Sequence, residues 1–317
     1  MQKKLSVLFS FKNEAKNLPY LIPRVVQVVD QCIAADLISN YELIFIDDCS
    51  NDSSLAILKK HKELNSNIKV HSTTRPFGNQ ECLRYAINQS MGDYICYLDA
   101  DLQDPPEIIF DILSKACMNQ LDVVYTQRIS RAGESRIKLL ITWFGYRFLS
   151  TISSYPLLKD SGDFTLISRR VADQFLVAKE SLPYIRGFVQ YLGYPSTIHR
   201  YHRSPRHDGQ AKTKFPIFQP NVWYGYVDRA LLSTTDLPLK ILFPVSFILL
   251  ILGILLLLHV IFQLMQGIAP PGWSSIMVLI IFSSSFNFLA LAFVSLYVNN
   301  IYLNSRARPD IVIREIL

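Results

Sequence analysis

Residues 96–107 read CYLDADLQDPPE, an apolar run that ends in two aspartates one residue apart, Asp99 and Asp101. Four other short apolar runs lie between positions 5 and 126, namely LSVLFSF, ELIFI, IKVHST and DVVYT. Segments with helical patterns separate these runs, at 18–35, 53–64, 80–89 and 105–118. Such alternation is typical of crossover units in a mainly parallel sheet that is covered on both faces. The sequence therefore predicts an α/β fold for this part of the chain.

The start of the last of these helices has a clear local marker. Asp104 precedes Pro105 and Pro106, and an aspartate cap followed by proline is typical of a first helical turn, where a missing N–H leaves no bond unmade. We therefore predict that Asp104 caps a helix over 105–118.

The C-terminal part has a different composition. Positions 241–305 contain no Asp, Glu, Lys or Arg, although these residues make up 18% of the chain. Segments 239–264 and 275–298 are each longer than the ~20 residues that a bilayer-spanning helix needs, and the short loop 265–274 separates them. Basic residues flank only the outer ends of this pair, so the positive-inside rule places both termini, including the tail 299–317, in the cytoplasm.

Two further segments carry Trp and Tyr beside bulky apolar residues and Arg, at 137–152 and 215–232. This composition favours helices that lie in the membrane interface, although one or both could simply pack on the cytoplasmic domain. We assign 1–214 to a cytoplasmic domain and 215–238 to a juxtamembrane interfacial helix.

Composition also narrows the functional classes. The five cysteines lack CxxC spacing, which fits a reducing cytoplasm and argues against a zinc site. The net charge of +6 comes without a nucleic-acid-binding motif, so anionic head groups or phosphorylated substrates are the better partners. Neither GxGxxG nor GxxxxGK[ST] occurs, which removes the usual dinucleotide and P-loop interpretations.

Polar residues follow several predicted strands at the edge where ligands of parallel sheets bind. Asp47 and Asp48 follow ELIFI, and Asp99 and Asp101 can point the same way because they are two residues apart in extended chain. Hard oxygen ligands suit Mg²⁺ or Mn²⁺, which leave positions for a nucleoside diphosphate. The alternative for either pair is turn chemistry alone; their context favours metal and nucleotide binding.

Several motifs in order resemble one known family: SVLFSFKNEAKNL, FIDDCSNDSS, RPFGNQECLRYAINQSMGDYICYLDADLQDPPE, SGDFTLISRR and RARP. The chain resembles the polyisoprenyl-phosphate glycosyltransferases of glycosyltransferase family 2, which include dolichyl-phosphate mannose synthases and bacterial undecaprenyl-phosphate glucosyl- and aminoarabinose-transferring enzymes. The resemblance covers nearly the whole chain. It implies a GT-A fold, a nucleotide-sugar donor, a polyprenyl-phosphate acceptor and inversion at the anomeric carbon. It also implies a multi-pass protein of the bacterial inner membrane that serves cell-envelope glycans such as lipopolysaccharide.

The resemblance implies roles for individual residues. The metal ligands would be Asp99, Asp101 and Gln103. The nucleotide-sugar would be held by Phe11, Asn13, Glu14, Asp47, Asp48 and Asp99. Asp163, in SGDF, would be catalytic beside Asp101, either as a base or as an orienting group. SGDF is more like the glucosyl-transferring relatives, which favours UDP-glucose over other UDP-sugars and GDP-mannose.

The acceptor phosphate and the donor diphosphate repel each other, so further cations are needed. Arg128 and Arg131 follow the fifth predicted strand, and Arg203, Arg206 and Lys212 precede the membrane segment. Singly, each would be a solvated surface charge; as a set we interpret them as the acceptor-phosphate site. Two spans also leave room for helix pairing between subunits, so a homo-oligomer stays open.

Two other functions compete with this interpretation. A processive polysaccharide synthase would share the domain, but QxxRW is absent and two spans are too few for a channel. A non-catalytic membrane scaffold or transport subunit would have no physical need to keep repelling carboxylates together at Asp99, Asp101 and Asp163.

Overall fold

The computed structural model describes residues 3–131, 158, 161–178, 184–203, isolated positions between 248 and 266, 272–305, 309 and 311–317. These residues belong to two compact units. The first contains the eight-stranded sheet and its covering helices, and the second contains helix α11.

The sheet has the strand order β7-β5-β6-β4-β1-β2-β3-β8. Its centre is parallel, because β1 pairs in parallel with both β2 and β4, and β2 pairs in parallel with β3. β6 runs antiparallel between β4 and β5. The mainly parallel sheet predicted from the sequence is thus confirmed. The strands are β1 (Lys4–Phe11), β2 (Asn40–Asp47), β3 (Ile68–Thr73), β4 (Tyr94–Asp99), β5 (Val123–Arg131), β6 (Ser161–Ser168), β7 (Ser196–Arg203) and β8 (Ile313–Ile316).

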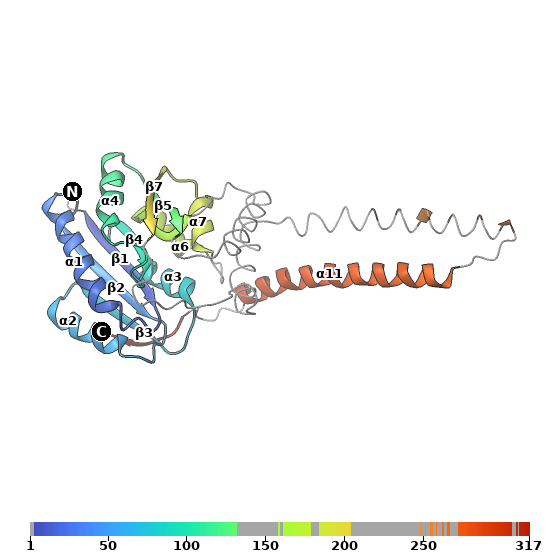
Figure 1. Ribbon diagram of the computed structural model, residues 1–317, viewed down its shortest axis with the longest axis horizontal. Helices are drawn as coiled ribbons and strands as arrows, with labels where there is room; N and C mark the ends of the chain where they lie inside the picture. Colours follow the sequence, from blue (N-terminus) through green and yellow to red (C-terminus); the bar gives the residue numbers. More distant parts are fainter. Residues whose placement is uncertain are drawn as a thin grey trace. The chain divides into compact units, whose positions relative to one another are not determined.

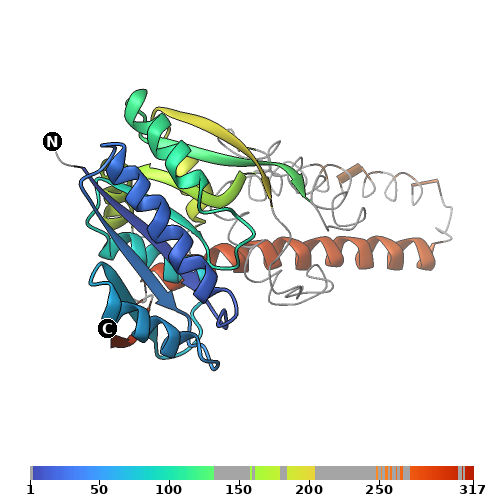
Figure 2. The same cartoon turned by 60° about the vertical axis from the view of Figure 1, so that its left-hand side comes forward.

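Helices cover both faces of this sheet (Figure 1). One face packs against α1 (Leu18–Ala34), α2 (Ser54–Leu64) and α4 (Ile108–Met118), and Figure 2 shows α1 and α4 lying side by side over it. The other face packs against α3 (Asn79–Gln89), α6 (Arg169–Val177) and α7 (Ile185–Tyr191). Central strands such as β1 are apolar almost throughout because both of their faces are buried.

The prediction for the start of α4 was wrong. The helix begins at Ile108 after an N-cap at Glu107, so Pro105 and Pro106 lie before it. Asp104 is fully buried and forms no cap, because its carboxylate accepts hydrogen bonds from Tyr201 and Arg128 instead.

Strand β5 is also longer than predicted. Its parallel pairing with β7 continues through Arg131, which lies opposite Arg203. Arg128 and Arg131 therefore lie within β5 rather than after it. The added residues are polar apart from the exposed Ile129, so the apolar run DVVYT marked only the buried half of the strand.

The last described residues add a strand that the sequence did not predict. Ile313–Ile316 lie in the predicted tail, but they form β8 and pair antiparallel with the edge of β3. Figure 1 accordingly marks the C-terminus beside α2 and β3.

Helix α11 (Trp273–Ser305) contains the second predicted span, 275–298. When only the described residues are considered, no helix combines the length and apolarity of a membrane-crossing segment. The two spans stay predictions. Segments 137–152 and 215–232 lie outside the described residues, as does most of 239–264.

Candidate active site

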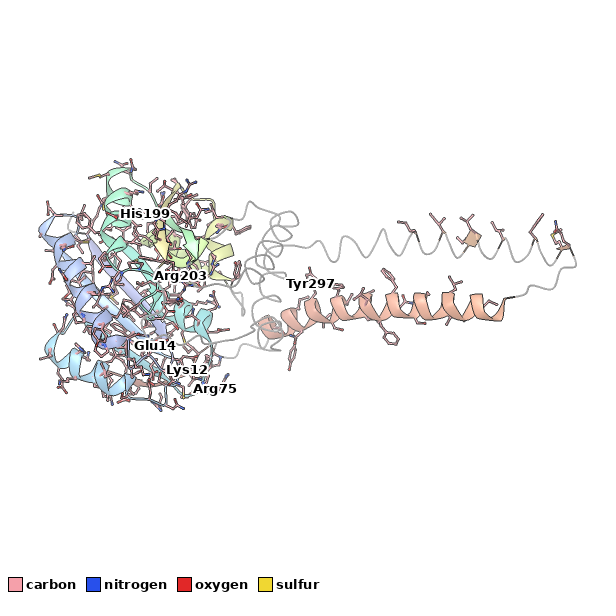
Figure 3. All side chains as sticks on the ribbon, in the orientation of Figure 1. Lys12, Glu14, Arg75, His199, Arg203 and Tyr297 are labelled. Atoms are coloured by element: carbon pink, nitrogen blue, oxygen red, sulfur yellow. The ribbon has the colours of Figure 1, made fainter. Side chains whose placement is uncertain are left out.

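The carboxyl ends of neighbouring strands bring the predicted donor residues to one edge of the sheet. The strand register pairs Phe11 of β1 with Asp47 of β2, and Ser10 of β1 with Asp99 of β4. Asp47 and Asp99 therefore lie on either side of the end of β1. Lys12, the residue after β1, is labelled at this end of the sheet in Figure 3.

Hydrogen bonds join the loops after β1 and β2. The fully buried Asp47 accepts bonds from the Ser50 N–H at Oδ1 (2.9 Å) and from the Ser72 hydroxyl at Oδ2 (2.8 Å). Asn13 donates its N–H to Ser50 Oγ (2.9 Å) and accepts at Oδ1 from the Asn51 N–H (2.9 Å). Asn13 has a φ of 57°, a conformation that asparagine adopts more readily than most residues. These hydrogen bonds thus join the loops after β1 and β2 into one polar network.

Glu14 and Asp48 have protein partners at the same edge. Glu14 Oε2 accepts a 2.6 Å hydrogen bond from Asn17 Nδ2. The carboxylate of Asp48 accepts the N–H groups of Phe77 (2.7 Å) and Gly78 (3.2 Å), which fixes the loop before α3. Both side chains shape the loops of the edge, and their contact with a nucleotide stays a prediction.

The turn after β4 carries the predicted metal ligands. Asp101 Oδ1 accepts a 3.1 Å hydrogen bond from the Gln103 N–H, and Leu102 between them has a φ of 59°. Burial and the negative charges of Asp163 and Asp101 raise the pKa of Asp99 to about 7. The raised pKa indicates that the nearby carboxylates and burial outweigh the positive charge of Arg128 at Asp99.

Asp163 lies next to this turn. Continuing the antiparallel register of Tyr97 with Thr165 by two residues places Asp163 opposite Asp99. Arg186 donates to Asp163 Oδ1 from Nη2 (2.6 Å) and Nε (3.2 Å). Burial would raise the pKa of Asp163, but the Arg186 charge and hydrogen bonds outweigh it and hold the pKa below its usual range. Asp163 is therefore ionised at neutral pH.

Arg186 was missed by the sequence analysis. It lies in the first turn of α7, and its neighbours Ile185 and Gly187 are both buried. An arginine between buried residues is usually paired with a carboxylate. The sequence shows that Arg186 follows an apolar residue, but it does not show which carboxylate the arginine contacts.

A second cluster surrounds the fully buried Asp104. The Tyr201 hydroxyl donates to Asp104 Oδ1, Arg128 Nη2 lies 3.1 Å from Oδ2, and Arg203 Nε lies 3.4 Å from Oδ1. Arg128 Nε also donates to the Tyr201 oxygen (3.2 Å). The two arginine side chains are only 15% and 17% exposed. Asp104 therefore fixes two of the predicted phosphate-binding cations, a role that the sequence analysis did not foresee.

The glycine of SGDF leaves room for one of these cations. A Cβ atom at Gly162 would lie 3.3 Å from Nε and Nη2 of Arg128. Glycine at this position of β6 thus leaves space for the Arg128 guanidinium, which reaches from β5 across to β6.

Three predicted phosphate-binding side chains are not placed. The backbone of Arg131 ends β5 opposite Arg203, whereas its side chain is not among those described. Arg206 and Lys212 lie outside the described residues. The structure therefore brings together Arg128 and Arg203 of the predicted set.

The donor set after β4 fits a hard divalent cation. Within the described parts of the chain, no group of three or more Asp, Glu, His or Cys side chains is placed to hold a metal by itself. Asp99 and Asp101 supply carboxylates and Gln103 an amide oxygen, and Mg²⁺ or Mn²⁺ commonly takes its other ligands from water and phosphate. The raised pKa of Asp99 is the effect that such a cation would relieve.

Comparison with known proteins identifies the family of the chain. A model of glycosyl transferase family 2 matches residues 6–176, which include Asp47, Asp99 and Asp163. The chain belongs to glycosyltransferase family 2. The protein is therefore a glycosyltransferase, and the acidic edge of its sheet lies within the part that defines the family.

This glycosyltransferase has relatives of similar length. An uncharacterized glycosyltransferase, YkcC of Bacillus subtilis (strain 168), is 30% identical over 98% of this chain and 93% of that protein. A prophage bactoprenol glucosyl transferase homolog of Escherichia coli (strain K12) is 25% identical over 99% of each chain. A solved structure of mannosyl-3-phosphoglycerate synthase from Rubrobacter xylanophilus has a TM-score of 0.46 at 16% identity, covering 65% of this chain and 68% of that one.

Proposed function

We propose that this glycosyltransferase moves a sugar from a nucleotide-sugar to polyprenyl (undecaprenyl) phosphate, with UDP-glucose as the favoured donor. The observation that carries the proposal is the segment Asp99–Asp104. It begins with the acidic residues suited to a metal and diphosphate, and it ends at the buried carboxylate that holds Arg128 and Arg203. The similarity to proteins named bactoprenol glucosyl transferase supports the choice of acceptor and sugar.

On the donor side, Asp99, Asp101 and Gln103 would hold Mg²⁺ or Mn²⁺. When bound, this ion neutralises charge on the departing nucleoside diphosphate. Asp47 and the loop at Asn13 would position the nucleoside, because their hydrogen bonds with Ser50 hold both loops in one arrangement before the ligand arrives.

On the acceptor side, Arg128 and Arg203 would bind the lipid phosphate. A phosphate monoester has a second pKa of about 6, so most of it is a dianion at neutral pH and needs no protein base. One phosphate oxygen attacks the anomeric carbon, a new C–O bond forms with inversion, and the bond to the diphosphate breaks. No proton has to move to the protein in this step.

Asp163 would then orient the reactants rather than accept a proton. Its ion pair with Arg186 keeps it ionised and lowers its basicity. Its negative charge also prevents the acceptor dianion from approaching Asp99 directly, which favours the side of the site where the arginines lie.

We further propose that segments 239–264 and 275–298 span the bacterial inner membrane, with the sheet domain and both termini in the cytoplasm. The absence of charged residues over 241–305 supports this proposal. Segments 137–152 and 215–238 would lie at the membrane surface, where the phosphate of a polyprenyl lipid is found.

The test is transfer of radiolabelled sugar to undecaprenyl phosphate by the purified full-length protein in detergent. A panel of UDP- and GDP-sugars is supplied with Mg²⁺ or Mn²⁺, and an EDTA sample is the control. We expect a labelled lipid from UDP-glucose that is lost with EDTA. A labelled lipid from another donor would correct the sugar, and a long polymer would favour a processive synthase. No product from any donor with folded protein would favour the scaffold alternative.

A further inference from the structure

Strand β8 carries a polar contact that extends to the donor edge. It pairs with β3 through the hydrogen bonds of Val70 with Leu317 (3.2 and 2.8 Å) and of the Thr74 N–H with the Val312 carbonyl (3.0 Å). Glu315 of this strand forms an exposed ion pair with Lys59 of α2 (2.8 Å). The pairing therefore holds the tail in one register against β3.

A bulge in this pairing determines where Arg314 lies. Ser72 pairs with Glu315 and Thr73 pairs with Ile313, so Arg314 has no residue opposite it. Bulges redirect a side chain that regular pairing would place elsewhere. Here Arg314 Nη2 donates to Ser72 Oγ at 3.0 Å.

The bond from Arg314 fixes the direction of the next one. Ser72 is 1% exposed, and its hydroxyl donates its single proton to Asp47 Oδ2 (2.8 Å). Because Arg314 takes a lone pair of the same oxygen, the hydroxyl is held as a donor to the carboxylate. Asp47 in turn accepts the Ser50 N–H, and Ser50 Oγ accepts the Asn13 N–H.

We propose that Arg314 is a positioning residue of the donor site, which acts through Ser72 on Asp47 and on the loops that carry Ser50 and Asn13. The inference rests on the proposed function, because it takes this edge to bind the nucleoside diphosphate of the donor. The tail after α11 thereby completes a site built by the opposite end of the chain. Arg314 touches neither the sugar nor the acceptor in this role, so it affects donor affinity and leaves the rate of the chemical step unchanged.

The exposure of Arg314 makes the inference easy to test. Its side chain is exposed apart from the contact with Ser72, so Arg314→Met removes the guanidinium and leaves the apolar core unchanged. Arg314→Lys keeps the charge, and Ser72→Ala removes the middle of the relay. Glu315→Gln is the matched control, because it weakens the ion pair of the same strand with Lys59 and keeps Arg314.

The measurement is the Kd of UDP, and in parallel of GDP, for the full-length protein in detergent with Mn²⁺. We expect Arg314→Met and Ser72→Ala each to weaken binding of the preferred nucleotide by about 3- to 10-fold. The double variant should bind no more weakly than either single one, because both act along one path. Arg314→Lys should recover part of the affinity, and Glu315→Gln should bind as the unchanged protein does. In transfer assays KM for the donor should rise while kcat and KM for the acceptor stay constant.

Three results would overturn the inference. Unchanged nucleotide affinity in Arg314→Met would show that the relay has no role in binding. An equal loss in Glu315→Gln would show that docking of the strand matters and the guanidinium does not. Failure of the unchanged protein to bind either nucleotide would reject the proposed function as well as the role of Arg314. Normal binding by the unchanged protein and by Arg314→Met would reject the role of Arg314 alone.

Discussion

At the scale of single residues, Asp99 and Asp163 show how neighbouring carboxylates acquire different properties. Burial raises the pKa of Asp99 to about 7, and the nearby carboxylates add to the effect. Burial acts in the same direction on Asp163, but Arg186 reverses it and lowers the pKa. The negative charge around Asp99 is thus not balanced by the nearby arginines, whereas Asp163 is already paired with Arg186.

The raised pKa of Asp99 predicts a pH-dependent stability. Between its ordinary value of 3.8 and about 7, the folded protein binds more protons at this site than the unfolded chain. Without metal, the free energy of unfolding should therefore fall as pH rises through this range, with the loss complete above pH 7. Relative to Asp99→Asn, which lacks this titration, the loss should reach at least about 1 kcal/mol, or ~2–4 °C in Tm.

Thermal unfolding in EDTA between pH 5 and 8 measures this effect. Mn²⁺ at pH 8 should raise the Tm of the unchanged protein more than that of Asp99→Asn. An identical pH dependence in both proteins would show that Asp99 is not the group responsible.

Gly162→Ala should weaken use of the acceptor. The new Cβ would press on the Arg128 guanidinium at 3.3 Å, and the ion pair with Asp104 (3.1 Å) restrains that group. We expect KM for undecaprenyl phosphate to rise about tenfold, which is a shift of ~1.4 kcal/mol. The donor KM and the Tm should change little. A larger effect on the donor KM would place Arg128 beside the diphosphate instead.

The sequence predicted some of these residues and could not predict others. Asp47 and Asp99 were found because each follows an apolar strand, and strand ends in a parallel sheet share an edge. Asp104, Arg186 and Tyr201 were missed because their importance lies in contacts between segments distant in sequence. Asp104 is 97 residues from its partner Tyr201, and local capping patterns offered a simpler explanation for it.

At the scale of elements, the buried parallel strands and their helices were predictable, and the strands near the edges were less so. β1, β2 and β4 are apolar runs because they are buried on both faces. β7 is mostly histidine and arginine over HRYHR and has only one buried residue, Tyr201. A strand with so little apolar sequence gives no periodic signal, and its place in the sheet depends on pairing with β5.

Gly92 lies in the turn before β4, and replacing it should lower the stability of the protein. A Cβ at Gly92 would lie 2.6 Å from the Ser6 backbone nitrogen and 2.7 Å from the Tyr94 carbonyl oxygen. These atoms belong to central strands and cannot move independently. Gly92→Ala should cost roughly 1–3 kcal/mol of stability, or about 3–10 °C in Tm.

This result contrasts with Gly162→Ala, where only a side chain has to move. Measuring Tm and acceptor KM for both variants distinguishes the two cases. An unchanged Tm in Gly92→Ala would mean that the turn can relax away from β1.

At the scale of the whole molecule, the chain leaves the sheet domain, forms helix α11 in the second unit and returns to add β8. This return was not predictable, because a four-residue strand in a short tail has no distinctive pattern. Its register depends on the edge that β3 exposes, and no property of the tail sequence specifies that edge.

Deleting residues 311–317 should destabilise the sheet domain. The deletion removes the pairing with β3 and the packing of Ile311 and Leu317 on the two apolar cores. We expect a loss of about 2 kcal/mol or more, equivalent to ~4–8 °C in Tm. An exposed β3 edge should also increase aggregation. Glu315→Gln, which changes only a surface ion pair, should stay close to the unchanged protein, and a deletion variant with the same Tm would show that β8 is dispensable.

The position of β8 also affects the order in which the protein is made. Ser72 and Arg314 are 242 residues apart, and translation runs from the first to the second. While the ribosome makes the intervening residues, β3 remains an open edge at which a nascent chain can pair wrongly. The residues of the proposed membrane hairpin are translated during the same interval. A nascent chain would therefore gain the contact of Arg314 with Ser72 only after the whole hairpin has been translated, so the proposed donor edge would be completed last.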